Sequence, residues 1–523
     1  MGKFEVWVSI LGLLLAGLLN VNSIRSNWTL KVSSTIIVPD QYSTIHEAIN
    51  NAVEGDTIFV RAGIYYEHVT IDKSISLIGE NKYTTIVDGE GTGSAIRVIS
   101  DNVTIIGFTV QNSGRAINNT VPDAGISTSH VSDCNVSGNL LTDNHVGIFV
   151  RPSRKNRFTN NVITHNHIGI DINNQSTHNI ISGNSLKENN VSIHIYYADS
   201  NVFFQNNLTD SPFGVASGHS SNNTFCRNEI SNVLNGIKIS YADFNNISQN
   251  VMSQLEHGIQ LKTDADHNFL SKNSITNCSY GIELLQADNN TISQNNITDC
   301  SYAGIDLDEH ARDNNLTNNT IANSEVGIDV SDWSANNTIS ANRLTANLVG
   351  MHFWYSNLNT ICENNITSNY AGVVVLYSQS NTFYHNTFLN NTKQVNTSDD
   401  YTNFWNDGYP SGGNYWSDYN GTDYYSGIMQ NITGSDGIGD ESYIIDDTTT
   451  DRYPLMEPWI PESLKTDLNN DGTVNIIDIS IVAMAFGSTH EDTNWNIIAD
   501  VNNDQVINIL DISMVAKDYG KTA

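Results

Sequence analysis

A glycine followed by an apolar residue recurs through most of the chain at steps of 22 or 23 residues. The pairs begin at Gly125, Gly147, Gly169, Gly214, Gly236, Gly258, Gly281, Gly304, Gly327, Gly350 and Gly372, with Ser192 filling the one gap. Between them lie short β-branched runs that lack helical spacing and the leucine consensus of leucine-rich repeats. Because a repeat of this length forms one solenoid coil, the pattern predicts an all-β fold, a right-handed single-stranded parallel β-helix over residues 36–400.

Each repeat also contains the pattern Asn-x-apolar-x-x-Asn, as in Asn223 to Asn228. Its second asparagine recurs at residues 139, 161, 184, 206, 228, 250, 273, 295, 319, 342, 364 and 386. Stacked coils hold equivalent side chains about 4.8 Å apart, where one amide can donate to the next carbonyl oxygen. We therefore expect asparagine ladders at the turns, where asparagine also tolerates a left-handed backbone.

The segment before the regular repeats predicts irregular coils, a cap and a leader. Apolar runs at 57–60, 69–71, 75–78 and 103–106 extend the β-helix backward. Residues 43–53 have helical spacing, with Ser43 as a plausible N-cap, and so predict a helix covering the open end of the core. Residues 1–26 contain Lys3 and a 14-residue apolar run, which is typical of a secretory signal peptide. That run is shorter than the roughly 20 residues of a membrane span, so we expect no stable span after cleavage.

The candidate catalytic and carbohydrate-binding residues lie at or near the outward-facing positions of the Gly-apolar strands. The first outward position reads Phe149, Asp171, His194, Ala216, Lys238, Gln260, Glu283, Asp306, Asp329, His352 and Val374 on successive coils. Acids on neighbouring coils must share protons or recruit a cation, and both outcomes suit work on a polysaccharide. The predicted catalytic residues are Glu283, Asp306, Asp329, Lys238 and Lys262, and the predicted carbohydrate-binding residues are Trp354, Tyr302 and Trp333.

Two chemistries and one inert interpretation fit this stripe. Neighbouring Asp306 and Asp329 suit an O-glycosyl hydrolase that retains configuration. Lys238 or Lys262, acting as base beside a uronate, suits a polysaccharide lyase. Alternatively, the acids only solubilise an exposed sheet face, and the sequence clusters of polygalacturonases and mannuronan epimerases are absent. Whether the chain is an enzyme stays open.

Composition limits the classes of partner and the covalent cross-links to be expected. With 24 basic and 56 acidic residues the formal net charge is −32, which repels phosphate backbones and argues against nucleic acid. Five scattered cysteines do not form a disulfide scaffold. Cys278 and Cys300 lie 22 residues apart and should stack on successive coils, where buried thiols are favoured and a disulfide is conceivable.

The last segment predicts a separate calcium-binding module. A proline-containing linker spans 459–466, and two similar acidic loops then each precede an apolar segment. Oxygen ligands at loop positions one, three, five, seven, nine and twelve suit a hard divalent cation such as Ca²⁺. The predicted ligands are Asp467, Asn469, Asp471, Thr473, Asn475 and Asp478 in the first loop, and Asp500, Asn502, Asp504, Val506, Asn508 and Asp511 in the second. Gln505 occupies a turn position that normally takes glycine, so the second loop should bind Ca²⁺ more weakly.

Several of these motifs resemble known families. Residues 36–67 and the coils through 458 resemble pectate-lyase-like and NosD-like β-helix proteins, and the motifs NYWSDY at 414–419, DGIGD at 436–440 and DRYPLM at 451–456 resemble a NosD-like closing module over 401–458. Residues 467–523 resemble a type I dockerin, which implies a small all-α calcium-binding domain and a cohesin-like partner. The copper role associated with NosD itself is not expected here, because no Met/His cluster is visible.

Two functions remain open at this stage. The first is a secreted, extracellular or cell-surface protein that binds or degrades a polysaccharide and assembles through its dockerin. The second is a non-catalytic adhesive rod attached by the same module. The glycan and the cohesin partner are not specified by the sequence.

Overall fold

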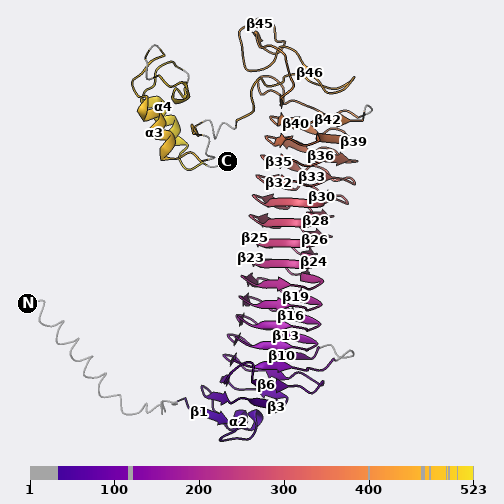
Figure 1. Ribbon diagram of the computed structural model, residues 1–523, viewed down its shortest axis with the longest axis vertical. Helices are drawn as coiled ribbons and strands as arrows, with labels where there is room; N and C mark the ends of the chain where they lie inside the picture. Colours follow the sequence, from indigo (N-terminus) through magenta and orange to yellow (C-terminus); the bar gives the residue numbers. More distant parts are fainter. Residues whose placement is uncertain are drawn as a thin grey trace, which may run out of the picture.

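The computed structural model describes residues 33–115, 122–398, 401–460, 466–469, 473–490, 492, 495–502 and 504–521. The predicted signal peptide and the predicted ligand Asp471 lie outside the described residues. The fold class is confirmed: the coils stack into one long parallel β-helix, and short helices near the C-terminus form the small module (Figure 1). No helix among the described residues is long and apolar enough to cross a membrane.

One face of the β-helix is a parallel sheet of sixteen strands in chain order. These strands are β1 (Thr35–Val38), β2 (Thr57–Val60), β5 (Ser76–Gly79), β8 (Thr104–Ile106), β11 (Asn135–Ser137), β14 (Arg157–Thr159), β17 (Ile180–Ser182), β20 (Val202–Phe204), β23 (Thr224–Cys226), β25 (Asn246–Ser248), β27 (Phe269–Ser271), β29 (Thr291–Ser293), β31 (Asn315–Thr317), β34 (Thr338–Ser340), β37 (Thr360–Cys362) and β40 (Thr382–Tyr384).

The other two faces share strands along the middle of the solenoid. The face that follows the sixteen-stranded sheet contains β3 (Gly63–Tyr66), β6 (Thr85–Asp88), β9 (Thr109–Gln111), β12 (Leu140–Thr142), β15 (Val162–Thr164), β18 (Ser185–Lys187), β21 (Asn207–Thr209), β32 (Thr320–Ala322), β35 (Arg343–Thr345), β38 (Asn365–Thr367), β41 (Thr387–Leu389) and β43 (Tyr415–Trp416). The face with the Gly-apolar pairs contains β4 (Val69–Ile71), β7 (Ile96–Val98), β10 (Ala124–Ser129), β13 (Val146–Arg151), β16 (Ile168–Asn173), β19 (Val191–Tyr196), β22 (Phe213–Gly218), β33 (Val326–Val330), β36 (Val349–Trp354), β39 (Ala371–Leu376) and β42 (Lys393–Thr397). Long strands run through both faces in β24 (Glu229–Ser240), β26 (Val251–Lys262), β28 (Ser274–Leu285) and β30 (Asn296–Asp308).

Buried asparagines line the turns and confirm the predicted ladders. In the middle of one column, Asn250 Nδ2 donates to the Phe225 carbonyl at 3.0 Å and to Asn273 Oδ1 at 2.9 Å. Its Oδ1 accepts the backbone N–H of Asn228 at 2.9 Å. A second column contains Asn156, Asn179, Asn201, Asn223, Asn245, Asn268, Asn290, Asn314, Asn337, Asn359, Asn381 and Asn403. Each amide therefore satisfies buried backbone groups that no strand pairs.

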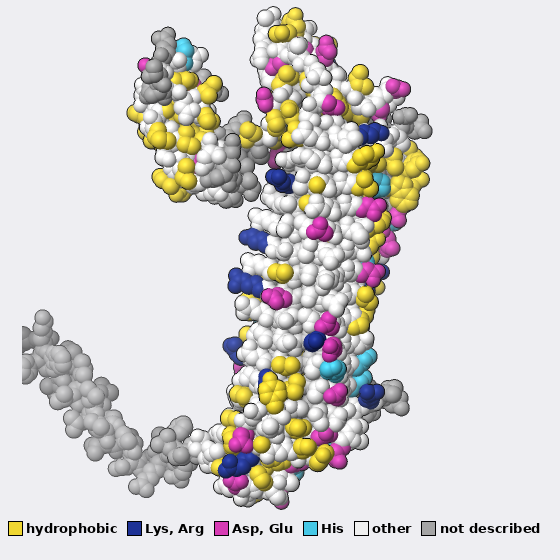
Figure 2. Space-filling view, viewed as in Figure 1, with side chains coloured by type: hydrophobic (Ala, Val, Ile, Leu, Met, Phe, Trp, Pro, Cys, Tyr) yellow, Lys and Arg dark blue, Asp and Glu magenta, His cyan; other side chains and the backbone are white. Residues whose placement is uncertain are grey.

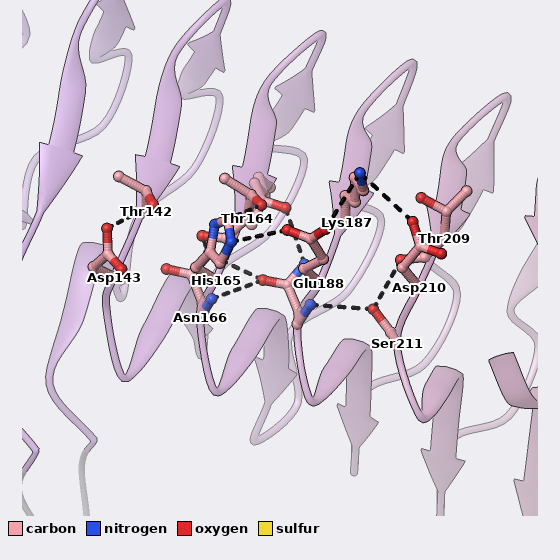
Figure 3. A network of polar contacts seen from close by, with 12 residues as sticks. Thr142, Asp143, Thr164, His165, Asn166, Lys187, Glu188, Thr209, Asp210 and Ser211 are labelled. Atoms are coloured by element: carbon pink, nitrogen blue, oxygen red, sulfur yellow. Dashed lines mark hydrogen bonds and ion pairs between the residues drawn. The ribbon is translucent and has the colours of Figure 1, made fainter. Parts of the chain in front are cut away.

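A third column stands at the corner between the two strand-sharing faces, and Figure 3 shows its first coils. Asn166 Nδ2 donates to Asn189 Oδ1 at 3.1 Å, and the Asn189 N–H donates to Ser211 Oγ at 3.2 Å. Outside this corner, His165 Nε2 lies 2.8 Å from a carboxylate oxygen of Glu188. Both side chains are exposed, so this contact adds little stability compared with the buried hydrogen bonds of the column.

The glycine of each Gly-apolar pair is required by the close approach of the next coil. A Cβ built on Gly258 would lie 2.4 Å from the Gly281 carbonyl oxygen and 2.8 Å from Ile275 Cγ2. Glycine avoids both contacts, although one coil carries Ser192 at the equivalent position. This contact explains the regular spacing of the motif.

A short helix packs at the N-terminal end of the core. α2 (Ile45–Asn51) buries Ile45, Ala48 and Ile49 against the first strands. Its N-cap is Thr44, whose side chain accepts the N–H of Glu47, so the expected cap at Ser43 was wrong by one residue. Ser43 instead donates to the Glu47 carboxylate.

The last coils end in stacked aromatic rings. Phe383 stacks on Trp405 and Phe388 stacks on Trp416, each pair with ring centroids 4.3 Å apart. The buried Asp451 carboxylate accepts the Asn414 N–H at 2.8 Å and the Trp416 Nε1–H at 2.9 Å. Two small antiparallel pairs lie in this closing segment, β44 (Tyr425–Ser426) with β45 (Ile432–Thr433) and β46 (Tyr443–Ile444) with β47 (Thr450–Asp451).

The C-terminal module contains α3 (Ile476–Met484), the 3₁₀ turn η2 (Ile497–Ala499) and α4 (Ile509–Lys517). Its own small core includes Leu468, Val474, Val482, Ile507 and Val515. Both helices begin with the same arrangement, a capping box between an asparagine and the aspartate three residues later.

Candidate functional site

The predicted acidic stripe exists in register. Glu283 in β28 pairs with Asp306 in β30, and Asp306 pairs with Asp329 in β33. The row continues to Gln260 before Glu283 and to His352 after Asp329. We call Gln260, Glu283, Asp306, Asp329 and His352 the acid row.

The acids of the row are buried, which corrects the expectation of an exposed stripe. Glu283, Asp306 and Asp329 are only 6%, 4% and 5% exposed. Neighbouring coils cover each acid above and below, since parallel strands lie about 4.8 Å apart. These carboxyl groups therefore do not serve as a solubilising surface.

Hydrophobic, acidic and histidine side chains gather along the edge of the solenoid where β36 and β39 lie (Figures 1 and 2).

Glu283 is held as a carboxylate by its own neighbours. Gln260 Nε2 donates a short hydrogen bond to Glu283 Oε2, and His257 Nδ1 lies 2.9 Å from the same oxygen. Burial acts to raise the pKa of Glu283, but these two contacts together hold it below its usual value. Glu283 is thus poised as a base or an electrostatic stabiliser rather than as a proton donor.

Asp306 has the opposite character. It is in the centre of the row, and its buried Oδ1 has no hydrogen-bond partner among the described residues. Burial, and then the negative charge of Asp329 and Asp308, raises the pKa of Asp306 well above its usual value. A carboxyl group in this position keeps its proton and can donate it.

Asp329 is paired with the imidazole of the next coil. His352 Nδ1 lies 2.9 Å from Asp329 Oδ1. The same contact occurs lower in the ladder, where His194 Nδ1 lies 2.8 Å from Asp171 Oδ1. Because the second pair repeats the first far from Asp306, the aspartate–histidine pair alone does not mark a catalytic centre.

The two predicted lysines lie at the lower end of the row. Lys238 pairs with Gln260 and is therefore two coils from Glu283. Lys262 is on the coil before Glu283, in the adjacent row, where it pairs with Leu285. Its positive charge helps to lower the pKa of Glu283. Neither lysine stands beside Asp306.

Aromatic side chains flank the acid row. On one side the rings of His257 and Tyr280 stack with centroids 5.0 Å apart, and Tyr302 follows Tyr280 at 4.8 Å. Burial, and then the charge of Asp306, raises the pKa of Tyr280 to about 12, so its hydroxyl stays protonated. Tyr302 itself is 45% exposed and remains available to a ligand.

The other predicted aromatic residues lie at the turn beyond the acid row. Trp333 stacks on Tyr355 with centroids 5.8 Å apart, and Tyr355 stacks on Tyr377 at 5.0 Å. Trp354 meets Tyr355 edge to face. Trp333 and Trp354 are 55% and 38% exposed, so they form an open aromatic surface.

Sequence reasoning missed two residues that shape this site, His257 and Tyr355, and it gave no role to Gln260 and Asp308. The side chains of His257 and Gln260 set the charge state of Glu283, and Asp308 raises the pKa of Asp306. His257 and Tyr280 occupy equivalent positions on successive coils, a signal that alignment of the repeats in the sequence contains.

In the C-terminal module, the twelfth-position aspartates cap helices and close the loops. Asp478 Oδ1 accepts the Leu468 N–H at 2.8 Å, and Asp511 Oδ2 accepts the Asn508 N–H at 2.8 Å. Asp500 Oδ2 accepts the N–H of Gln505, which has the expected left-handed backbone with φ of 66°. The ligands predicted for these loops would offer oxygen atoms, the donor chemistry that Ca²⁺ prefers. Among the described residues, no three His, Cys, Asp or Glu side chains converge into a metal site.

Comparison with known proteins gives two family matches. The model described as "Periplasmic copper-binding protein (NosD)" matches residues 49–235 and 230–421, and the type I dockerin domain model matches residues 465–518. No curated protein matches the chain significantly.

Solved structures with a similar chain path are distant in sequence. DFA-IIIase from Arthrobacter chlorophenolicus A6 is 13% identical with a TM-score of 0.43, over 55% of this chain and 94% of that one. The mannuronan C-5 epimerase A-module of Azotobacter vinelandii is 12% identical with a TM-score of 0.30, over 69% and 92%. An alginate lyase from Paenibacillus sp. is 14% identical with a TM-score of 0.33, over 50% and 94%.

Proposed function

The chain belongs to the NosD family of parallel β-helix proteins and ends in a type I dockerin domain, and on this basis we propose that it is an extracellular or cell-surface protein that hydrolyses a polysaccharide while docked to a cohesin module. The observation that carries the catalytic part is the buried, unpartnered Asp306 between two further acids. The dockerin carries the assembly part.

Asp306 is the proposed proton donor. Its neutral carboxyl group would protonate the oxygen that leaves as the glycosidic bond breaks, which general acids accelerate by about 10²–10⁴-fold. Glu283 or Asp329, one coil away on either side, would act as nucleophile or would stabilise the positive charge that develops on the sugar ring. Tyr302, Trp333 and Trp354 would hold the sugar chain by stacking.

The charge of the site favours a glycan without carboxylates. Glu283, Asp308 and Asp329 already raise the pKa of Asp306, and a uronate bound beside them would add another negative charge. Lyase chemistry also needs a base near the abstracted proton, and both Lys238 and Lys262 are away from Asp306. We therefore favour a neutral or amino-sugar polymer over a uronate polymer.

Copper has no place in this proposal. The family description names copper, but among the described residues no group of three His, Cys, Asp or Glu side chains is placed to hold a metal ion. The acid row offers mainly hard oxygens, and its one imidazole, that of His352, is paired with Asp329, whereas copper prefers several soft or imidazole ligands.

The catalytic test uses release of reducing ends from neutral, amino-sugar and uronate polymers by the full-length protein. We expect activity on a polymer without carboxylates, reduced at least about a hundredfold in Asp306→Asn. The exposed Asp313→Asn on the same solenoid is the matched control. If no polymer is cleaved, or if Asp306→Asn cleaves as fast as the control, the hydrolase assignment is wrong.

A second candidate, the non-catalytic rod, is favoured by one observation. Glu283 and Asp329 already contact His257 and His352, so the protein itself supplies their partners. A rod would bind its cohesin normally and would neither cleave nor bind any polymer of the panel. Affinity electrophoresis of the full chain in gels containing each polymer separates a binding protein from a rod.

For the C-terminal module we propose two Ca²⁺ ions held by the predicted loop ligands, including Asp467, Asp471, Asp500 and Asp504. Bound Ca²⁺ would join oxygens from both ends of each loop and so fix the directions of α3 and α4. Calorimetry of the full chain should show Ca²⁺ binding that is lost in Asp467→Ala/Asp500→Ala and kept in the exposed control Glu457→Gln. Equal Ca²⁺ binding by both variants would refute the ligand assignment, and failure of the loaded chain to bind any of a panel of cohesins would refute the docking role.

A further inference from the structure

Two cysteines interrupt the third turn column at the centre of the solenoid. On the outer coils this column is built of asparagines, but through the long strands β24, β26, β28 and β30 its members change. In chain order they are Asn144, Asn166, Asn189, Ser211, Val233, Leu255, Cys278, Cys300, Ser324, Asn347, Asn369 and Asn391. At Cys278 and Cys300 the coils have lost the amide bridge that joins other coils at this corner.

The geometry brings the two sulfur atoms together. Cys278 and Cys300 are direct partners in the parallel ladder between β28 and β30. Neighbouring parallel strands place partner Cα atoms near 5 Å apart, inside the range of about 4.4–6.8 Å that disulfides span. Both residues are thiols in this structure, 5% and 2% exposed, and their Sγ atoms are 2.7 Å apart.

We propose that Cys278 and Cys300 are oxidised to a disulfide that staples two successive coils beside the acid row. Among the described residues, the other coils are joined at this corner only by hydrogen bonds and packing. The disulfide would replace the missing asparagine bridge with a covalent one. Sequence spacing alone favoured buried thiols. The paired register and the direct approach of the sulfur atoms reverse that preference.

The oxidation balances as a thiol–disulfide exchange with a low-molecular-weight or protein disulfide as oxidant. One cysteine thiolate attacks the oxidant, forms a mixed disulfide and releases a first thiol. The second cysteine then attacks the mixed disulfide and releases a second thiol, so the pair loses two electrons and two protons to the oxidant. The neighbouring Cys300 sulfur, and then burial, raises the pKa of the Cys278 thiol. Both thiols are buried in the folded chain, so we expect the exchange to happen before the coils close over them.

The staple would fix the strands that place the acids. The register between β28 and β30 shifts just after the cysteines, because one extra residue lies between Cys300 and Asp306 compared with Cys278 and Glu283. Such a bulge re-aims the side chains that follow it. A covalent link immediately before the bulge would hold Tyr280, Tyr302 and the acids in one relative position.

Labelling and mass spectrometry test the bond directly. The full chain, refolded in a buffer of oxidised and reduced glutathione, is unfolded without reductant in the presence of iodoacetamide and digested. We expect Cys134, Cys226 and Cys362 to carry the label, while a linked peptide pair containing Cys278 and Cys300 appears, lighter by two hydrogen atoms than the two peptides together. Label on both Cys278 and Cys300 would overturn the proposal.

A second measurement keeps the proposal testable through stability. Reducing the disulfide with dithiothreitol should speed amide hydrogen exchange in residues 274–308 of the refolded chain on the order of a hundredfold. This is the factor expected from the chain entropy lost when a disulfide closes a ring of 22 residues. The Cys278→Ser/Cys300→Ser variant should not respond to dithiothreitol, and Cys226→Ser should respond like the parent. An equal response of the double variant and the parent would exclude the staple. This result does not depend on whether the acid row is catalytic.

Discussion

Replacing the buried Asn250 by alanine should destabilise the middle of the solenoid, whereas replacing its exposed neighbour Asn246 should not. Asn250 is fully buried in the ladder, and Asn246 is exposed on the same coil. The two substitutions remove the same side chain from positions four residues apart. The comparison therefore isolates the hydrogen bonds of the ladder from the intrinsic preferences of asparagine.

The magnitude follows from the contacts of Asn250. Its Oδ1 accepts both the backbone and the side-chain amide of Asn228, and its Nδ2 donates to Phe225 O and Asn273 Oδ1. Losing the acceptor of a buried backbone N–H costs about 2 kcal/mol, and each of the other three lost bonds costs about 1 kcal/mol. The Asn228 side chain keeps its bond to Phe203 O, which limits the loss. We expect roughly 5 kcal/mol in all.

Hydrogen exchange is the suitable assay, because a solenoid opens locally rather than as one unit. Amides of residues 223–275 should exchange up to about five-thousandfold faster in Asn250→Ala, and amides near Asn381 should be unchanged. If Asn250→Ala and Asn246→Ala exchange alike, the ladder does not hold the coils together, and packing of the apolar core must do so alone.

Two further outcomes follow from single side chains. Gly258→Ala should lower the melting temperature markedly, because its Cβ would meet the Gly281 carbonyl oxygen at 2.4 Å. Gly218→Ala should be tolerated, because its Cβ would make an ordinary 3.4 Å contact with Tyr196. Equal melting temperatures of the two variants would contradict the packing argument. Burial raises the pKa of Asp451 to about 7, opposed by the N–H donors of Asn414, Trp416 and Tyr453. As the pH rises, the folded state therefore keeps this proton longer than the unfolded chain does. The stability that results is complete below pH about 4 and is lost as the pH rises through about 7. Urea unfolding followed by tryptophan fluorescence should show Asp451→Asn gaining up to about 4 kcal/mol on the parent between pH 4 and 8, and a constant difference would rule out the raised pKa.

The solenoid could be predicted from the sequence because each coil repeats the same local requirements. Glycine at the close approach, asparagine at the turns and apolar residues facing inward recur at a fixed step, and the register of Glu283, Asp306 and Asp329 followed from counting that step. The break in the third column was harder to see, because Val233, Leu255 and Cys278 only look exceptional once the column is known.

The chemistry of the acid row was less predictable. Alternation along a strand tells which side chains point away from the core, but it does not tell how much the adjacent rows cover them. Burial of Asp306 depends on neighbours from other coils, and the charge state of Glu283 depends on His257 and Gln260. These contacts join residues about one repeat apart, so they follow from the register and not from local sequence.

The stacking of one coil on the next also makes the β-helix a measuring rod. Sixteen strands in one sheet, each about 4.8 Å above the last, span roughly 70 Å, and removing or adding one repeat would change that span by a fixed increment. If the dockerin holds one end to a partner, the number of repeats sets how far from the anchoring point the acid row can reach. Evolution could therefore adjust working distance by duplicating coils without redesigning the site or the anchor.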